Sequence, residues 1–375
     1  MNILDLPTPS LIVDRGRVIA NTLAMRQRMN ELGVTLRPHA KTAKSAAVAR
    51  LAHGNENPQG GLTISTLAEA AYFLDHGFSD LVYAVCVAPA KLDSVSALRD
   101  RGAALKIITD NVDASQAIGA HPGSHEVLVE IDCGEHRTGV TADGPELLEI
   151  ADAVAKSGRS KMAGVLTHAG HSYGSRNGRE AADIAEAERA AAVQAASRLR
   201  EAGHATPIIS VGSTPTAMHA RHLDGVTEAR PGVYVFQDLF QAGIGSCGWE
   251  DMALSVLGSV IARHPARGTL MLDTGGLALS KDRSTAALDS DGDKGFGLIC
   301  DATGGPLAGL HIAGVHQEHG EVKVDDPALF EKLPIGGKVR IFPNHACMTA
   351  AAYDTYHVVD GGMDIVDTWD RCNGW

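Results

Sequence analysis

Short apolar runs alternate with alanine-rich segments of helical character up to about residue 240, and this alternation constrains the fold more than any other feature of the chain. The runs are VTLRPHAK (34–41), GLTIST (61–66), DLVYAVCV (80–87), ALKIITD (104–110), EVLVEID (126–132), MAGVLTHAG (162–170), PIISVGS (207–213) and VTEARPGVYVF (226–236). Segments between them, such as 179–203, mix alanine with charged residues, as helices that cover a sheet do. Repeated strand and helix units predict a parallel sheet.

Eight runs with seven helical segments between them match a (β/α)8 barrel in number and in length. A doubly wound open sheet is the alternative. Polar residues end nearly every run, and they are Lys41, Thr66, Asp110, Asp132, His168, Ser213 and Arg230. Because barrel enzymes build their active sites at this carboxyl-terminal rim, the pattern favours an α/β barrel.

After residue 240 the sequence pattern changes to strand-like runs without long helical segments between them. These runs include ALSVLGSVIAR, GTLMLDT and GKVRIF. This pattern predicts a smaller β domain. We therefore expect a barrel domain at 10–240 and a β domain at 241–375, with residues 1–9 joining the β domain. The run LPTPSLIVD is the segment that would join it before the barrel starts.

Composition narrows the class of ligand. The 375 residues carry a net charge of −12 and no Lys/Arg block, which argues against a nucleic-acid or membrane surface as partner and favours a small-molecule substrate. The first residues lack a basic, apolar leader, and no stretch has the ~20 apolar residues that span a bilayer, so we expect a cytoplasmic protein. Six cysteines without CxxC spacing predict no disulfide framework.

Glycine-rich turns follow the last two runs of the barrel. VGSTPT (211–216) follows the seventh and RPGVY (230–234) lies in the eighth, where barrels recurrently bind phosphate. Either turn alone would be ordinary. Together with a lysine that closes the first run, they suggest pyridoxal phosphate, whose aldehyde a lysine holds as a Schiff base.

Two lysines compete for that role. Lys41 closes the first run, whereas Thr42 can cap the next helix and Lys44 would then face solvent in its first turn. Arg37, His39 and Lys41 alternate along the run, so they share a face and can surround the cofactor and an anionic substrate. The alternative keeps Arg37 and His39 as structural hydrogen-bonding residues.

Nine short motifs of the chain resemble those of a known enzyme family. The motifs span the chain in order, and they are TPSLIVD, RPHAKTAKS, STLAEA, EIDCGEHRTGV, LTHAG, VGSTPT, RPGVYVF, QEHG and PNHACMT. The chain resembles the D-threonine aldolase and D-serine dehydratase family, pyridoxal-phosphate enzymes of the alanine racemase fold type. The resemblance implies a (β/α)8 barrel with a C-terminal β domain, and a homodimer.

The resemblance also implies roles for single residues. Lys41 would form the Schiff base and His168 would lie against the cofactor ring. Arg137 would lie near the phenolic oxygen, and either Arg230 or Tyr173 would face the pyridine nitrogen. The residues implied to hold the phosphate are Gly212, Ser213, Gly232 and Tyr234.

A metal pair is expected in the β domain. His345 and Cys347 stand two apart after KVRIF, so on an extended chain both side chains point to one face. An imidazole and a thiolate suit Zn²⁺. Alone, this spacing is a weak signal, more typical of a half-buried cysteine beside a surface histidine than of a metal site. The resemblance favours the metal, since the second position is thiolate in the dehydratases and carboxylate in the aldolases.

The expected reaction is dehydration of a D-3-hydroxy amino acid, of the D-threo-3-hydroxyaspartate or D-serine type, to a 2-keto acid and ammonia. The alternatives are aldolase cleavage to glycine and an aldehyde, a non-catalytic pyridoxal-phosphate protein, and a sugar-phosphate enzyme that needs no Schiff base. A racemase would need a tyrosine base from the β domain, and none occurs between Tyr234 and Tyr353.

Overall fold

The computed structural model describes residues 1–54, 57, 59–288 and 291–375. It divides into two compact units. The barrel unit contains Thr22–Gly232 and Cys372–Trp375, and the β unit contains Met1–Asn21 and Val233–Arg371.

Eight parallel strands form the sheet of the barrel unit, in the order β2-β9-β8-β7-β6-β5-β4-β3 within the described residues. They are β2 (Thr35–Leu36), β3 (Leu62–Ile64), β4 (Asp80–Cys86), β5 (Ala104–Thr109), β6 (Glu126–Ile131), β7 (Lys161–Thr167), β8 (Ile208–Val211) and β9 (Glu228–Ala229). A parallel bridge between His39 and Thr63 joins the two ends of this order, so the sheet closes. The expected barrel is confirmed.

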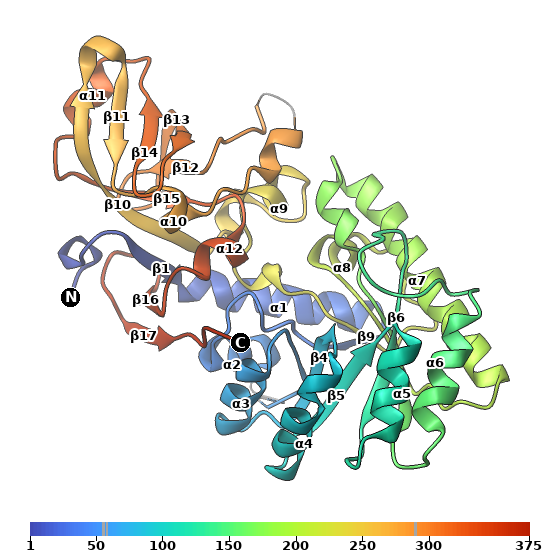
Figure 1. Ribbon diagram of the computed structural model, residues 1–375. Helices are drawn as coiled ribbons and strands as arrows, with labels where there is room; N and C mark the ends of the chain where they lie inside the picture. Colours follow the sequence, from blue (N-terminus) through green and yellow to red (C-terminus); the bar gives the residue numbers. More distant parts are fainter. Residues whose placement is uncertain (55–56, 58, 289–290) are drawn as a thin grey trace. The chain divides into compact units, whose positions relative to one another are not determined.

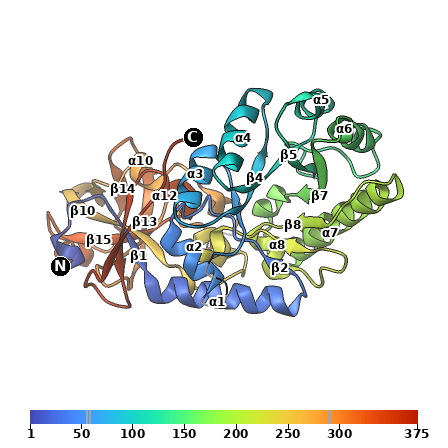
Figure 2. The ribbon, with the colours of Figure 1, turned by 90° about the horizontal axis from the view of Figure 1, so that it is seen from below.

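Helices connect successive strands, as the alternating runs predicted. They are α2 (Ala46–His53), α3 (Leu67–Asp75), α4 (Leu92–Asp100), α5 (Val112–Ala120), α6 (Glu146–Ala155), α7 (Gly178–Glu201) and α8 (Thr214–His219). The long helix α7 lies beside β7 and β8 (Figures 1 and 2). Its alanines at 181, 185, 192 and 195 are buried, because residues three or four apart share a helix face.

The β unit contains a mostly antiparallel sheet with the order β11-β14-β13-β12-β15-β10-β1-β16-β17 in the part of the chain that is described. Its strands are β1 (Ser10–Asp14), β10 (Leu254–His264), β11 (Thr269–Leu272), β12 (Leu298–Cys300), β13 (Pro306–Val315), β14 (Gly320–Lys323), β15 (Lys338–Phe342), β16 (Thr355–Val359) and β17 (Asp367–Asp370). Its helices are α9 (Leu239–Gly243), α10 (Gly276–Leu279), α11 (Ala328–Lys332) and α12 (Ala346–Ala350).

The domain boundaries differ from the expected ones at 9/10 and 240/241. Strand β1 pairs with β10 and β16, and all five of its residues are buried, so the run LPTPSLIVD joins the β unit as expected and the expected boundary at 9/10 falls too early. The boundary falls inside α1 (Arg15–Glu31) and again at 232/233. The reason is that β1 is a central strand of the nine-stranded sheet, whose neighbours stand more than 200 residues later.

None of the six cysteines, all of which lie in described segments, forms a disulfide. No helix of the described chain combines the length and apolar character needed to cross a membrane.

Candidate active site

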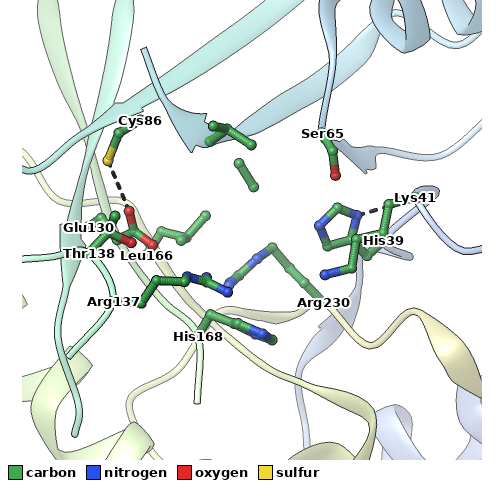
Figure 3. Close-up of a pocket in the computed structure, with 12 residues that line it drawn as sticks. His39, Lys41, Ser65, Cys86, Glu130, Arg137, Thr138, Leu166, His168 and Arg230 are labelled. Carbon is green, nitrogen blue, oxygen red and sulfur yellow. Dashed lines mark hydrogen bonds between the residues drawn. The ribbon is translucent and has the colours of Figure 1, made fainter. Parts of the chain in front are cut away.

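A cavity of about 470 Å³ lies at the carboxyl ends of the barrel strands, where the sequence predicted a site (Figure 3). This volume is within the range of roughly 300–1,000 Å³ that is usual for small-molecule sites. The ionisable side chains that line it are basic except for Glu130 and the Cys86 thiol, and the basic ones are His39, Lys41, Arg137, His168 and Arg230. Such a lining favours an anionic ligand.

The turn after β2 separates the two candidate lysines. Lys41 lines the cavity, whereas Lys44 Nζ lies 3.0 Å from the Glu69 carboxylate, whose side chain is fully buried. Lys44 is only 15% exposed, so the expectation that it faces solvent is wrong. The helix also begins later than expected, because Ser45 rather than Thr42 takes the N-cap position of α2.

His168 follows β7 and is held in one tautomer. Its Nδ1 lies 3.0 Å from the Gly212 carbonyl oxygen, which can only accept, so Nδ1 carries the proton and Nε2 keeps its lone pair. Burial and the neighbouring Lys41 charge lower the pKa of His168 to about 3, although the hydrogen bond to Gly212 opposes this. The imidazole is therefore neutral at physiological pH.

His39 and Arg37, which alternate on the first run, have different surroundings. Burial, with Lys41 and Arg230 nearby, lowers the pKa of His39 well below its ordinary value, so this cavity imidazole is also neutral. Arg37 instead forms two ion pairs at 2.8 Å, a buried one with Glu228 and a half-exposed one with Asp80, and it is not among the cavity-lining residues. Of the two readings for Arg37, the structural one is confirmed.

Arg230 is buried at the cavity wall after β9. Its Nη1 donates to Ser210 Oγ and its Nη2 to the Thr167 carbonyl, both at 2.6 Å. Its Nε is buried and has no hydrogen-bond partner within the described chain. Burial lowers the pKa of this guanidinium, and the charge of Glu228 opposes the shift. Because buried N–H groups are normally satisfied, this Nε is a donor that an acceptor from a ligand would satisfy.

The other two candidates for cofactor contact differ in exposure. Arg137 lines the cavity from the loop after β6, is 54% exposed and lies 3.3 Å from Glu135. Tyr173 lies in the short helix η3 (Gly170–Gly174) and is half-buried. It is not among the residues that line the cavity, but its neighbour Ser172 contacts the loop described next.

The predicted phosphate loop is tightly built. Gly212 has φ +129°, and a Cβ there would lie 2.7 Å from the Arg230 backbone nitrogen, so only glycine fits. Ser213 Oγ lies 2.8 Å from Ser172 Oγ and 3.0 Å from Thr216 Oγ1. A Cβ on Gly232 would lie 3.1 Å from the His39 carbonyl. Tyr234 lies in η4 (Val233–Val235), which belongs to the β unit.

Glu188, which no sequence motif indicated, is a fully buried residue of α7 that accepts hydrogen bonds from two backbone N–H groups near the cavity. A signal was present. Glu188 falls on the stripe of buried alanines at 181, 185 and 192, where a charged side chain must have partners.

A second missed group is Cys86 with Asp110 and Glu130, whose ligand-type atoms lie within 4.8 Å of one another. The Cys86 thiol donates to Glu130 at 3.0 Å (Figure 3). Burial and the two carboxylates raise the pKa of this thiol, which therefore stays protonated. No spacing in the sequence connects these residues, because they come from three neighbouring strands.

His345 and Cys347 are both in the β unit and interact through their side chains. The expected extended geometry is wrong, because α12 begins at Ala346 and places Cys347 in its first turn. His345 Nδ1 lies 2.5 Å from Asp282 Oδ2, which fixes the ring and leaves Nε2 as the nitrogen that a metal can take. Asp238 accepts from the Ala346 N–H and supports the same turn.

Two family models match the chain. Residues 13–239 match the alanine racemase N-terminal domain, and residues 253–359 match the putative serine dehydratase domain.

Relatives of known name cover the whole chain. D-threo-3-hydroxyaspartate dehydratase of Delftia sp. is 44% identical over 100% of this chain and 99% of the relative. D-serine dehydratase of Dictyostelium discoideum is 30% identical over 100% and 98%. D-threonine aldolase of Arthrobacter sp. is 29% identical over 97% and 91%.

Solved structures of D-threo-3-hydroxyaspartate dehydratase superpose closely. The structure from Delftia sp. HT23 has a TM-score of 0.93 at 44% identity, with 100% of both chains covered. A cysteine-to-alanine variant of this dehydratase, described as the metal-free form, has a TM-score of 0.94 at 43% identity, with 100% of both chains covered. A histidine-to-alanine variant is equally similar. The two substituted residues stand two apart, as His345 and Cys347 do.

Proposed function

The chain belongs to the alanine racemase-like family that contains the D-serine dehydratases and D-threonine aldolases, and on this premise we propose that it dehydrates a D-3-hydroxy amino acid. The enzyme is then a carbon–oxygen lyase. The products are a 2-keto acid and ammonia, namely oxaloacetate from D-threo-3-hydroxyaspartate and pyruvate from D-serine. This proposal rests mainly on one observation: the entire chain is 44% identical to D-threo-3-hydroxyaspartate dehydratase.

The family is pyridoxal phosphate-dependent, and the barrel cavity fits that cofactor. Lys41 supplies the amine, and the buried Nε of Arg230 offers a donor that lacks an acceptor. Gly212 lets the loop after β8 lie against the Arg230 backbone beside the cavity, where a Cβ would not fit. The residues that would hold the cofactor are Lys41, Arg137, His168, Tyr173, Gly212, Ser213, Arg230, Gly232 and Tyr234.

The ionisation states in the cavity support this assignment of roles. His39 and His168 are neutral, so the positive charges available to phosphate and carboxylate groups are those of Arg137 and Arg230. Lys41 would instead act as an amine, and it would be the residue that takes the proton from Cα. When bound, pyridoxal phosphate would delocalise the electrons left on Cα, and a divalent metal would make the hydroxyl a better leaving group.

His345 and Cys347 would hold the metal. Nε2 of His345 is available because Nδ1 is bound to Asp282, and a thiolate beside an imidazole favours Zn²⁺ over harder ions. Two protein ligands leave coordination positions for the substrate. The related dehydratase whose cysteine is replaced by alanine is described in a metal-free form, and this supports a metal-binding role for Cys347.

The test is product analysis. Purified enzyme with D-threo-3-hydroxyaspartate, D-serine or D-threonine should release keto acid and ammonia in equal amounts, with little glycine. The aldolase relative makes carbon–carbon cleavage the competing function, and glycine with an aldehyde as the main products would establish it. Chelation should stop turnover without releasing pyridoxal phosphate, and Zn²⁺ should restore it. Full activity without metal would contradict the metal assignment.

The same resemblance supports a homodimer in the cytoplasm. Light scattering should give about twice the 39.2 kDa mass of one chain. A monomer that is fully active would contradict this assembly.

A further inference from the structure

A single buried carboxylate oxygen joins the ends of two neighbouring barrel strands. Glu188 Oε1 accepts from the Ala169 N–H at 2.9 Å and from the Gly212 N–H at 3.0 Å. Ala169 directly follows His168, and Gly212 is the residue whose carbonyl accepts from His168 Nδ1 at 3.0 Å. The His168 ring, the two backbone groups and the carboxylate thus form a closed loop of hydrogen bonds.

We infer that Glu188 is a positioning residue that fixes the tautomer of His168 and the conformation of the Gly212–Ser213 loop. This inference rests on the proposed function, in which His168 and the loop hold pyridoxal phosphate. Glu188 acts through backbone groups and touches neither the cofactor nor the substrate.

The geometry explains why a carboxylate is used here. Gly212 offers both of its backbone groups at this point: its N–H donates to Glu188 while its carbonyl accepts from His168. If the loop rotated, its carbonyl would leave Nδ1, and the His168 proton could move to Nε2. One acceptor that reaches both strand ends prevents that rotation.

The surroundings of Glu188 indicate that its side chain matters as a hydrogen-bond acceptor rather than as a negative charge. The side chain is fully buried, and burial raises the pKa of its carboxyl group, while the two N–H groups and Thr216 oppose the shift. Thr216 also accepts from the Ser213 N–H at 3.0 Å, so the contact extends to the loop. We therefore expect glutamine, which keeps an acceptor oxygen, to replace Glu188.

The experiment compares three variants. Glu188→Gln keeps the acceptor, and Glu188→Met removes it with little change in size. Glu186→Gln on the same helix is the matched control, because its side chain is 43% exposed and pairs with Arg189. If Glu188→Met does not fold, Glu188→Asp gives the same contrast, since its shorter side chain cannot reach both strand ends.

The first readout needs no cofactor. Nitrogen NMR of ¹⁵N-histidine-labelled apoprotein distinguishes the two tautomers, and the His168→Gln spectrum assigns the signal. Wild type, Glu188→Gln and Glu186→Gln should show the proton on Nδ1. Glu188→Met should show a mixture with Nε2–H. An unchanged tautomer in Glu188→Met, or a mixture in Glu188→Gln, would overturn the inference.

The second readout separates positioning from general destabilisation. The Kd of pyridoxal phosphate should rise about tenfold or more in Glu188→Met, because donors to a charged group are misplaced, while the Kd of pyridoxal, which lacks the phosphate, should rise by less than about threefold. Equal losses for both ligands would refute a role in the phosphate loop. If wild type binds neither ligand, the proposed function fails, whereas the tautomer contrast still decides the role of Glu188.

Discussion

At the scale of single residues, the two lysines of the turn after β2 have contrasting contacts, and their variants should fail differently. Lys41→Ala should abolish activity and covalent retention of pyridoxal phosphate, because the cavity amine is lost. Lys44→Ala should keep covalent retention but lower the free energy of unfolding by about 3 kcal/mol, because Glu69 becomes an unpaired buried charge.

Borohydride reduction with peptide mapping, together with denaturant unfolding, checks both lysines. A pyridoxyl group on Lys44 would reverse the assignment. The double variant Lys44→Ala/Glu69→Gln should recover part of the lost stability, since it removes the uncompensated charge.

The thiolate at Cys347 gives a second prediction. Cys347→Asp should harden the metal site, so that Zn²⁺ weakens relative to Mn²⁺ and dehydration falls by about tenfold or more. Remaining turnover should shift toward glycine, because the hydroxyl can still bind. Metal analysis and product ratios check this, with Cys300→Ala, in the apolar cluster around Phe342, as the control that keeps its metal. Unchanged metal preference would contradict the role of sulfur.

The site could be predicted from the sequence where the chemistry is local. Lys41, His168 and Arg230 end or follow strands, and the rule that barrel sites gather at strand ends placed all three at one cavity. Contacts between distant segments could not be predicted. Lys44 is paired with Glu69 and Arg37 with Glu228, and neither partner stands at a spacing that a pattern could reveal. The helical turn at Cys347 was missed because five residues are too few for periodicity.

At the scale of elements, the loop after β8 depends on glycine. Gly212→Ala should lose stability by about 1–3 kcal/mol from the positive φ alone, and more from the approach to the Arg230 backbone. It should also weaken pyridoxal phosphate binding. Gly203→Ala is the matched control, because Gly203 has φ +89° and nothing within 4 Å of its added Cβ. It should lose stability but keep cofactor affinity. Equal affinity losses in both variants would contradict a specific role for the loop.

The apolar runs predicted where the barrel strands lie but not how long they are. All eight barrel runs became strands, but the runs at 34–41 and 226–236 contribute only two residues each to β2 and β9. Pro38 and Pro231 lie in these runs, and proline cannot donate to a ladder, so the pairing is short there. Strands β12, β14 and β16, of three, four and five residues, were not among the runs predicted after residue 240.

At the scale of the whole molecule, buried histidines predict acid sensitivity. Burial, as the main cause, lowers the pKa of His53 and His125 to about 4 and that of His168 to about 3, and it lowers the pKa of His39 well below its ordinary value. The unfolded chain binds these protons below about pH 6.5, whereas the folded chain does not, so stability is full above that pH and falls as pH drops toward 4.

Thermal unfolding of the apoprotein between pH 8 and 4.5 checks this. The Tm should be level above pH 7 and then fall. In His125→Gln the Tm should fall less steeply with decreasing pH, because one fewer proton is bound on unfolding. A Tm that rises on acidification to pH 5 would show that these histidines are protonated in the folded state.

Domain organisation was predictable in kind but not in boundary. The loss of long helices after residue 240 indicated a second unit, yet the sequence has no local mark for the boundary within α1, because helix periodicity continues across it. Strand β1 joins partners from the far end of the chain, and such pairing depends on the whole fold. The physical reason is that burial pattern identifies a strand but not its neighbours.

The way the barrel sheet closes indicates where its backbone hydrogen bonds open most readily. β6 and β7 are paired over six residues, whereas β2 is joined to β9 over two, and a single bridge from His39 joins the segment after β2 to β3. The Arg37 side chain adds ion pairs to Glu228 and Asp80. Lys41 therefore lies at the seam with the fewest ladder bonds. Amide protons of residues 35–37, 39 and 40 should exchange with deuterium sooner than those of β6, and faster still in high salt, because screening weakens the half-exposed Asp80 pair most.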